Sequence, residues 1–297
     1  MLKTLQHSLY IIGDVLRDMT QLVKLKLTML VVFTSSLAFI MSGGWSMGLH
    51  SIFIFILGGF FVSGAANSLN QILEKDFDSQ MNRTKDRPLA SGRMATSFAI
   101  LMAGTMCISG LMLLAYFNTL TALLGAISVI LYAFIYTPLK RYSPISVFVG
   151  AFPGALPVLI GCVAVTGEIT VFALLLFAIQ FFWQFPHFWA IGWLSFEDYK
   201  KAGFKIVPTV DGKIDREIGK QSVIYTALII PASILFYQFG FIALLGLILV
   251  LAGGLFFLYK AYLFYKDPSD FSARKLLFAS LYFLPIIFSV LMFNMNY

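Results

Sequence analysis

The sequence is short of charged residues. Only 12% of its 297 residues are charged, whereas 59% are hydrophobic. An ordinary soluble domain has about 25% charged residues and is about half apolar. This balance excludes an ordinary water-soluble globular protein. The nearly charge-free runs that recur along the chain approach the roughly 20 residues that a helix needs to cross a bilayer.

Cysteine is scarce as well. Cys107 and Cys162 are the only two cysteines and fall in different hydrophobic runs, so a disulfide framework is not expected. The formal net charge is +7, but the chain has no soluble basic domain that could bind nucleic acid, and Lys and Arg are common beside membrane spans. We therefore expect these basic residues to lie beside a lipid bilayer and not to bind nucleic acid.

The hydrophobic runs predict helices. Barrel strands would alternate polar and apolar residues, but runs such as 52–61 and 241–258 are apolar on every side. We predict an all-α fold, a polytopic membrane bundle of about nine transmembrane helices forming one domain over residues 1–297. The spans are expected at about residues 27–42, 51–73, 95–115, 119–137, 146–165, 171–194, 221–240, 242–263 and 275–295.

The first 22 residues form a separate amphipathic segment. Leu5, Leu9, Ile12 and Leu16 share one helical face, so residues 1–22 are expected to lie along the membrane surface.

The positive charges predict the orientation. With the N-terminus inside, all 21 Lys and Arg residues fall on the inner side. The outer connections then hold only Glu168 and His50 as acidic or histidine residues. The positive-inside rule therefore predicts a cytoplasmic N-terminus and an external C-terminus.

The second span ends in a polar helix face. Asn67, Asn70, Glu74 and Asp78 recur at i, i+3, i+7 and i+11, which puts them on one side of a helix. Oxygen ligands at this spacing suit a hard divalent cation, and Mg²⁺ is commonly held by one or two carboxylates together with substrate phosphate oxygens. The pattern indicates a magnesium site that a phosphorylated substrate completes.

A simpler interpretation is a solvated helix end whose carboxylates pair with Lys75 and Arg83. Asn67 and Asn70 favour the functional interpretation, because polar groups inside spans are energetically expensive and usually functional.

Further polar residues gather at the inner ends of other spans. They are Tyr136, Lys140 and Arg141 after the fourth span, Trp183, Gln184 and His187 within the sixth, and Asp198 after it. Together these segments combine acids for a metal with cations for phosphate oxygens.

Four motifs carry a family resemblance. The series Asn70-x3-Glu74-x3-Asp78, followed by Arg83-Thr84-x2-Arg87-Pro88, resembles the first aspartate-rich motif of the UbiA-type intramembrane prenyltransferase superfamily. More narrowly, Tyr136-x3-Lys140-Arg141, Trp183-Gln-x-Pro-His187 and Asp198-Tyr-x2-Ala202-Gly203 resemble the protoheme IX farnesyltransferase (heme O synthase) family. Glu74 stands where Asp is usual, and Ser146 replaces a common Asn. Ala202, where many superfamily members have a second-motif Asp, is typical of the heme branch.

The resemblance implies a UbiA-like fold and a reaction. Members of that family transfer the farnesyl group of farnesyl diphosphate to a vinyl group of heme B, with addition of water. The products are heme O and pyrophosphate, on the route to the heme A of terminal oxidases. The resemblance also implies a bacterial plasma (inner) membrane, active-site loops on the cytoplasmic side, and heme A synthase as a partner.

It further implies roles for the motif residues. Asn70, Glu74 and Asp78 are expected to hold one Mg²⁺, directly or through water, and Asp198 a second. These four residues and Lys140 are the expected catalytic residues. The diphosphate is expected at Arg83, Arg87, Tyr136, Lys140 and Arg141, and heme at His187, Trp183 and Gln184. A lone histidine inside a span can also be a hydrogen-bonded packing residue.

Two other functions share these features. A UbiA-type polyprenyltransferase acting on an aromatic quinone precursor would have the same magnesium site, but the Trp-Gln-x-Pro-His and Asp-Tyr-x2-Ala-Gly patterns speak against it. A cation-coupled secondary transporter could use Asn70, Glu74 and Asp78 as a cation path. Transporters usually have broken helices that meet at mid-membrane, whereas these residues cluster at one edge.

Overall fold

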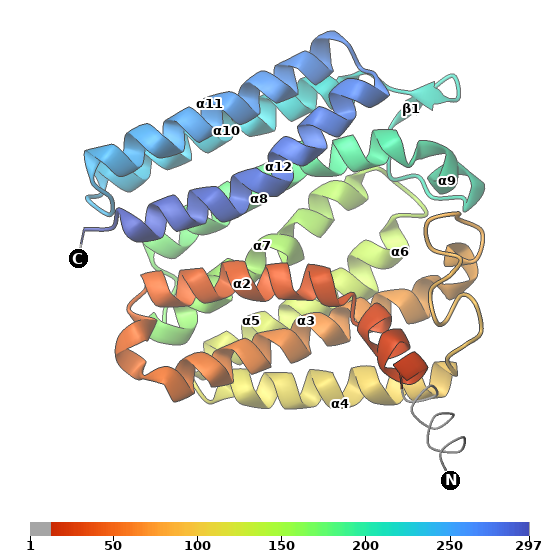
Figure 1. Ribbon diagram of the computed structural model, residues 1–297, viewed down its shortest axis with the longest axis horizontal. Helices are drawn as coiled ribbons and strands as arrows, with labels where there is room; N and C mark the ends of the chain where they lie inside the picture. The colour runs from red at the N-terminus through yellow and green to blue at the C-terminus, as the bar shows by residue number, and fades with distance from the viewer. Residues whose placement is uncertain (1–12, 297) are drawn as a thin grey trace.

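The computed structural model describes residues 13–296 and is a bundle of long helices packed side by side (Figure 1). The long helices are α2 (Leu25–Met41), α3 (Leu49–Asp78), α4 (Thr96–Ala115), α5 (Thr119–Val129) continued by η2 (Ile130–Tyr136) and α6 (Thr137–Leu139), α7 (Ile145–Thr166), α8 (Val171–Leu194), α10 (Glu217–Gln238), α11 (Leu244–Lys266) and α12 (Asp270–Phe293). Within the described residues, eight helices are long and apolar enough to cross a membrane, or up to nine if a bent pair at the start forms one span. The predicted all-α membrane bundle is confirmed.

Several short elements were not predicted from the sequence. A 3-10 turn, η1 (Gly44–Met47), connects α2 to α3. The connection after α8 contains a short helix, α9 (Phe196–Lys201), and a hairpin of β1 (Thr209–Val210) and β2 (Lys213–Ile214) in antiparallel pairing. The sequence indicated only a polar loop there, because segments this short carry no readable periodicity.

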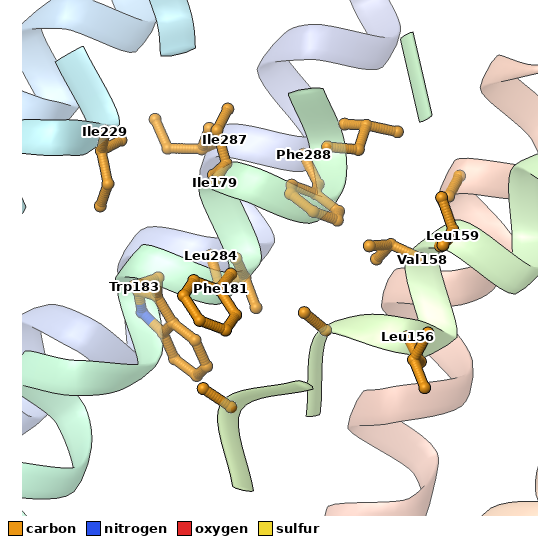
Figure 2. Close-up of a cluster of buried hydrophobic side chains, with 14 of the residues drawn as sticks. Leu156, Val158, Leu159, Ile179, Phe181, Trp183, Ile229, Leu284, Ile287 and Phe288 are labelled. Carbon is orange, nitrogen blue, oxygen red and sulfur yellow. The ribbon is translucent and has the colours of Figure 1, made fainter. Parts of the chain in front are cut away.

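The helices α7 and α8 form the centre of the bundle. In their most apolar stretches, 72% and 61% of the residues are buried, against 22–39% in the other helices that are by themselves long and apolar enough to span a membrane. The outer helices expose apolar side chains, as expected for surfaces that face lipid. Figure 2 shows the cluster of buried side chains at the centre, to which α7 contributes Val158, α8 Ile179, α10 Ile229 and α12 Phe288.

Glycines allow close approach between helices at two contacts. A Cβ on Gly161 of α7 would lie 2.3 Å from the carbonyl oxygen of Ser35 on α2. A Cβ on Gly110 of α4 would lie 2.8 Å from the backbone nitrogen of Val62 on α3. Small residues at such contacts let membrane helices pack backbone to backbone.

The longer connections lie at one end of the bundle. In Figure 1 the segments 79–95, 140–144 and 195–216 lie on the right, where α3 ends, and the C-terminal end of α12 is at the opposite end. The ends of helices far apart in the sequence are thereby brought together, and the polar motifs lie at these ends.

The chain enters the bundle through a bent pair of helices. Residues Gly13–Leu22 form a helix that meets α2 at 53°. Leu16 on it is exposed. The other three residues of the predicted amphipathic face, Leu5, Leu9 and Ile12, lie outside the described residues. The single domain over the whole chain also stays a prediction.

Candidate active site

The polar face of α3 is buried. The helix continues five residues past the predicted span end, to Asp78, and this extension carries Glu74 and Asp78 as part of the same face. Asn67, Asn70, Glu74 and Asp78 are all at most 5% exposed. The interpretation as a solvated helix end is therefore wrong. Asp78 is buried, although its place at the end of a span suggested exposure to water.

Asn70 is the centre of a hydrogen-bond network. Its Nδ2 donates to Glu74 Oε2 and to Thr137 Oγ1, both at 2.9 Å. Its Oδ1 accepts from Lys24 Nζ at 2.7 Å. A carbonyl oxygen has two lone pairs, so Oδ1 keeps one for a further partner. The network orients the amide and joins three segments that are distant in the sequence.

Both carboxylates of this face form buried ion pairs. Glu74 contacts the ammonium group of Lys140, and both side chains are under 10% exposed. Asp78 Oδ2 accepts from Arg87 Nη1 at 2.7 Å. The second oxygen, Asp78 Oδ1, is buried and has no hydrogen-bond partner among the described residues. A buried, unpartnered carboxylate oxygen is costly and is available to a cation.

A π-helical turn shapes the opposite wall. The hydroxyl of Thr137, the first residue of α6, donates to the carbonyl of Tyr132 in η2 at 2.8 Å, and the widened turn directs Tyr132 and Tyr136 to the site. Such turns are rare and occur frequently at functional sites. The Tyr136 ring lies 4.7 Å from Lys140 Nζ. It packs so closely on Gly150 of α7 that a Cβ there would come within 2.6 Å.

The segment after α9 covers the site. The backbone nitrogen of Lys205 donates to the carbonyl of Lys140 at 2.7 Å, which fixes this segment over the end of α6. Phe204 is thereby placed with its ring 5.7 Å from Lys140 Nζ. On the other side, Arg83 Nη2 donates to the Tyr199 hydroxyl at 3.3 Å.

These residues enclose a cavity of about 150 Å³. Its lining is Lys24, Asn70, Glu74, Asp78, Met81, Arg83, Arg87, Tyr132, Tyr136, Lys140, Phe188, Ile191, Tyr199, Phe204 and Ile206. Four cationic side chains and two carboxylates face this space, an excess of two positive charges. A cavity with this excess of positive charge attracts a polyvalent anion.

Lys24 is a site residue that the sequence did not reveal. It stands between the first described helix and α2 in the left-handed conformation, with φ 49° and ψ 57°. This conformation costs a non-glycine residue about 1–2 kcal/mol, and such strain concentrates at functional positions. Its sequence signal was hidden, because a lysine before a span is what membrane anchoring alone predicts.

Arg141 and Asp198 lie outside the cavity lining. Arg141 Nη2 donates to the carbonyl of Leu73 at 2.9 Å, and its guanidinium group lies 3.9 Å from the Phe77 ring centroid. Asp198 accepts from the backbone nitrogen of Arg83 at 3.3 Å. The structure thus places Asp198 as a support of the Arg83 segment, and does not bring it together with Glu74 and Asp78.

The three predicted heme residues lie on α8 with their polar groups engaged. Trp183 Nε1 donates to the carbonyl of Ser280 at 2.8 Å, and Gln184 Nε2 donates to the carbonyl of Ala151 at 3.0 Å. His187 Nδ1 lies 2.8 Å from the Ser280 hydroxyl, and its ring stacks on Trp183. They face α12 and α7, while Phe188 and Ile191 of the same helix line the cavity.

Asn70, Glu74 and Asp78 are the candidate ligands of a divalent cation at this site. Among residues 13–296, no three His, Cys, Asp or Glu side chains are grouped closely enough to hold a metal ion. Asn70, Glu74 and Asp78 offer an amide and two carboxylates on one helix face, including the unpartnered Asp78 Oδ1. Such an incomplete oxygen set suits Mg²⁺, which commonly takes its remaining ligands from water and substrate phosphates.

Comparison with known proteins gives the family. The profile of the UbiA prenyltransferase family matches residues 30–284. The chain belongs to the UbiA prenyltransferase family. A curated relative, the protoheme IX farnesyltransferase of Flavobacterium psychrophilum, is 45% identical over 284 residues, covering 93% of each chain. The resemblance found in the motifs is confirmed, and the protein is a prenyltransferase.

Solved structures confirm the UbiA fold. A digeranylgeranylglyceryl phosphate synthase superposes with a TM-score of 0.79 at 20% identity, covering 94% of this chain and 98% of the other. A UbiA homologue from Archaeoglobus fulgidus bound to GPP and Mg²⁺ superposes with a TM-score of 0.65 at 14% identity, covering 92% and 99%. At these identities the likeness establishes the fold. The chain is therefore a multi-pass integral membrane protein of this family.

Proposed function

We propose that the protein transfers the farnesyl group of farnesyl diphosphate to a vinyl group of heme B, forming heme O and pyrophosphate. The observation that carries the proposal is the cationic cavity, in which Glu74 and Asp78 face Arg83, Arg87 and Lys140. The 45% identity to a curated protoheme IX farnesyltransferase indicates the acceptor. A quinone precursor or a transported cation has no comparable support.

The diphosphate head occupies the cavity in this proposal. Lys24, Arg83, Arg87 and Lys140 contact its oxygens, and the Tyr136 ring holds the Lys140 ammonium group in place. Asn70, Glu74 and Asp78 would hold Mg²⁺, which neutralises charge on the departing diphosphate. Asp198 supports the arrangement through the Arg83 backbone. Arg141 contributes by stabilising the end of α3, where its guanidinium contacts Phe77 and Leu73.

The reaction consists of ionisation, addition and hydration. The bond between the farnesyl C1 and the diphosphate oxygen breaks, and its electron pair leaves with pyrophosphate. The π electrons of the heme vinyl group form the new carbon–carbon bond to C1. Water adds to the resulting cation beside the porphyrin ring and loses a proton. The cationic groups act mainly on the first step, because they stabilise the negative charge that develops on the leaving oxygen.

Heme B is proposed to approach along α8. Ser280 donates its hydroxyl proton to the carbonyl of Leu277 at 2.6 Å, so its oxygen is free to accept from His187 Nδ1–H at 2.8 Å. This leaves Nε2 of His187 with the lone pair that an iron ligand requires. Trp183 supports the histidine by stacking on its ring. Gln184 supports it by fixing α8 to α7, because its Nε2 donates to the carbonyl of Ala151.

The proposed location is the bacterial plasma (inner) membrane, with the N-terminus and the cavity on the cytoplasmic side and the C-terminus outside. Support comes from the distribution of the 21 Lys and Arg residues and from the opposite positions of the long connections and the end of α12 (Figure 1). Heme A synthase, which consumes the product, is the proposed protein partner.

The test is reconstitution. Purified protein in lipid nanodiscs is supplied with heme B, farnesyl diphosphate and Mg²⁺, and heme O is sought by mass spectrometry. Asp78→Asn serves as the control, because it keeps the side-chain size but removes the charge. A parallel reaction contains 4-hydroxybenzoate in place of heme B. Prenylation of 4-hydroxybenzoate and not of heme B would establish the quinone alternative and refute the proposal.

A further inference from the structure

The first described helix is attached to α3 through the side chain of Gln71. Gln71 Nε2 donates to the carbonyl oxygen of Gln21 at 2.7 Å and to that of Leu22 at 2.8 Å. Both carbonyls belong to the last turn of the helix Gly13–Leu22, where backbone acceptors have no partner within the helix. Gln71 is 1% exposed and uses both donors of its amide. It therefore caps that helix from another segment.

The neighbouring residue on α3 holds the chain just beyond that helix. Asn70 Oδ1 accepts from Lys24 Nζ at 2.7 Å, so Gln71 and Asn70 contact the chain on the two sides of the bend. The bend itself requires the left-handed conformation of Lys24, with φ 49°. A non-glycine residue keeps this conformation only where surrounding contacts impose it. Within the segment, the backbone nitrogen of Lys24 donates to the carbonyl of Gln21 at 3.1 Å, and the Thr28 hydroxyl donates to the carbonyl of Val23 at 2.6 Å. The hydrogen bonds of Gln71 and Asn70 fix this bend against α3.

A second contact holds the same helix further from the site. Arg93 donates to both carboxylate oxygens of Asp18, at 3.1–3.2 Å, and Asp18 is 7% exposed. Arg93 belongs to the connection after α3, so this ion pair fixes the helix to that connection. Arg93 also donates to the side-chain oxygen of Gln21 at 3.2 Å, but Gln71 is the side chain of α3 that holds the backbone carbonyls of Gln21 and Leu22.

We propose that Gln71 is a positioning residue for diphosphate binding: by holding the carbonyls of Gln21 and Leu22, it fixes the bend that places the Lys24 ammonium group in the cavity. The proposal rests on the proposed function, in which the cavity binds the diphosphate head. It makes the N-terminal helix part of the active site. Gln71 has no contact with substrate in this arrangement and acts only through Lys24.

A double-mutant cycle tests this dependence. Lys24→Met, Gln71→Met and the double variant are purified in nanodiscs, and their affinity for inorganic pyrophosphate is measured by calorimetry with Mg²⁺ present. A charge-assisted hydrogen bond implies that Lys24→Met weakens binding about 10- to 100-fold. Gln71→Met should weaken it by up to the same factor. If Gln71 acts through Lys24, the double variant should bind as Lys24→Met does, within about twofold.

Matched controls come from nearby exposed residues. Lys26→Met removes the same charge two residues from Lys24, at an exposed position. Gln80→Met removes an exposed amide whose Nε2 donates only to the carbonyl of Asp76 among the described residues. Both controls should bind pyrophosphate as the unchanged protein does. In turnover assays, Gln71→Met and Lys24→Met should both raise KM for farnesyl diphosphate. A general loss of folded protein would lower the amount of active enzyme and would not raise KM.

Three results would overturn the proposal. The first is unchanged pyrophosphate binding in Gln71→Met. The second is a double variant whose loss of pyrophosphate affinity equals the product of the losses in the two single variants. The third is failure of both Gln71→Met and Gln71→Glu to fold while Lys24→Met folds. Gln71→Glu keeps the shape of the side chain and loses the amide donors. Because the cycle uses pyrophosphate alone, it can succeed even if no heme O is formed. That outcome would refute only the proposed acceptor.

Discussion

The buried pair of Asp78 and Arg87 allows folding and chemistry to be separated. The side chains are 2% and 21% exposed, and the oxygen and nitrogen lie 2.7 Å apart. Removing one partner of a buried pair typically costs about 3–5 kcal/mol, because the other charge stays buried without compensation. Since Arg87 keeps some access to water, we expect Asp78→Leu to cost about 3 kcal/mol, near the lower end of that range.

This loss corresponds to a fall in melting temperature of about 6–12 °C, at roughly 2–4 °C per kcal/mol for a chain of this size class. The double variant Asp78→Leu/Arg87→Met removes both charges and should recover most of the lost stability, because replacing a buried pair by apolar groups is often neutral or stabilising. Neither variant should form heme O, because each lacks the Asp78 carboxylate proposed to hold Mg²⁺.

The measurements are thermal unfolding in detergent and turnover with heme B and farnesyl diphosphate. Glu217→Gln is the control for the ion pair. It breaks the Glu217–Lys220 pair, whose side chains are more than half exposed, and should cost at most about 1 kcal/mol. A double variant as unstable as Asp78→Leu would refute the energetic reasoning. A double variant that turns over substrate would refute the role of Asp78 in metal binding.

Three further predictions concern the site and the topology. A reporter fused at the C-terminus should read as external and one in the 195–220 connection as cytoplasmic; the same side for both would refute the orientation. EDTA should abolish turnover of the unchanged protein and Mg²⁺ should restore it, whereas full activity without divalent metal would remove the cation from the mechanism. His187→Ala should weaken heme absorbance while leaving pyrophosphate binding intact, and Lys140→Met should do the reverse; equal loss of both ligands in His187→Ala would indicate a packing role.

Helical periodicity predicted one wall of the site and none of its partners. Asn70, Glu74 and Asp78 were placed on one face because the period of 3.6 residues is a local property of the chain. Their contacts are not local. Lys24 is 46 residues from Asn70, and the ammonium group that Glu74 contacts belongs to Lys140, beyond two further helices. The packing of α3 against other segments decides these partners, and no pattern within α3 encodes it.

The burial of Asp78 was missed for a related reason. A carboxylate that comes after an apolar run is ordinarily at the membrane surface, where water solvates it. Here α3 projects past that run, and the chain at 83–87 folds back so that Arg87 reaches Asp78. The sequence contains the arginine, but the turn that returns it to the helix end is irregular structure with no periodic signal.

Lys140 and Arg141 show what sequence alone cannot separate. They are adjacent, both cationic and both expected at the diphosphate. Successive residues at a helix end point in different directions, however, so at most one of them can face a given wall. The structure directs Lys140 to Glu74 and the cavity, and Arg141 to Phe77 and the carbonyl of Leu73. The π-helical turn before them decides which residue faces inward, because an added residue in one turn rotates the rest of the helix by about 100°.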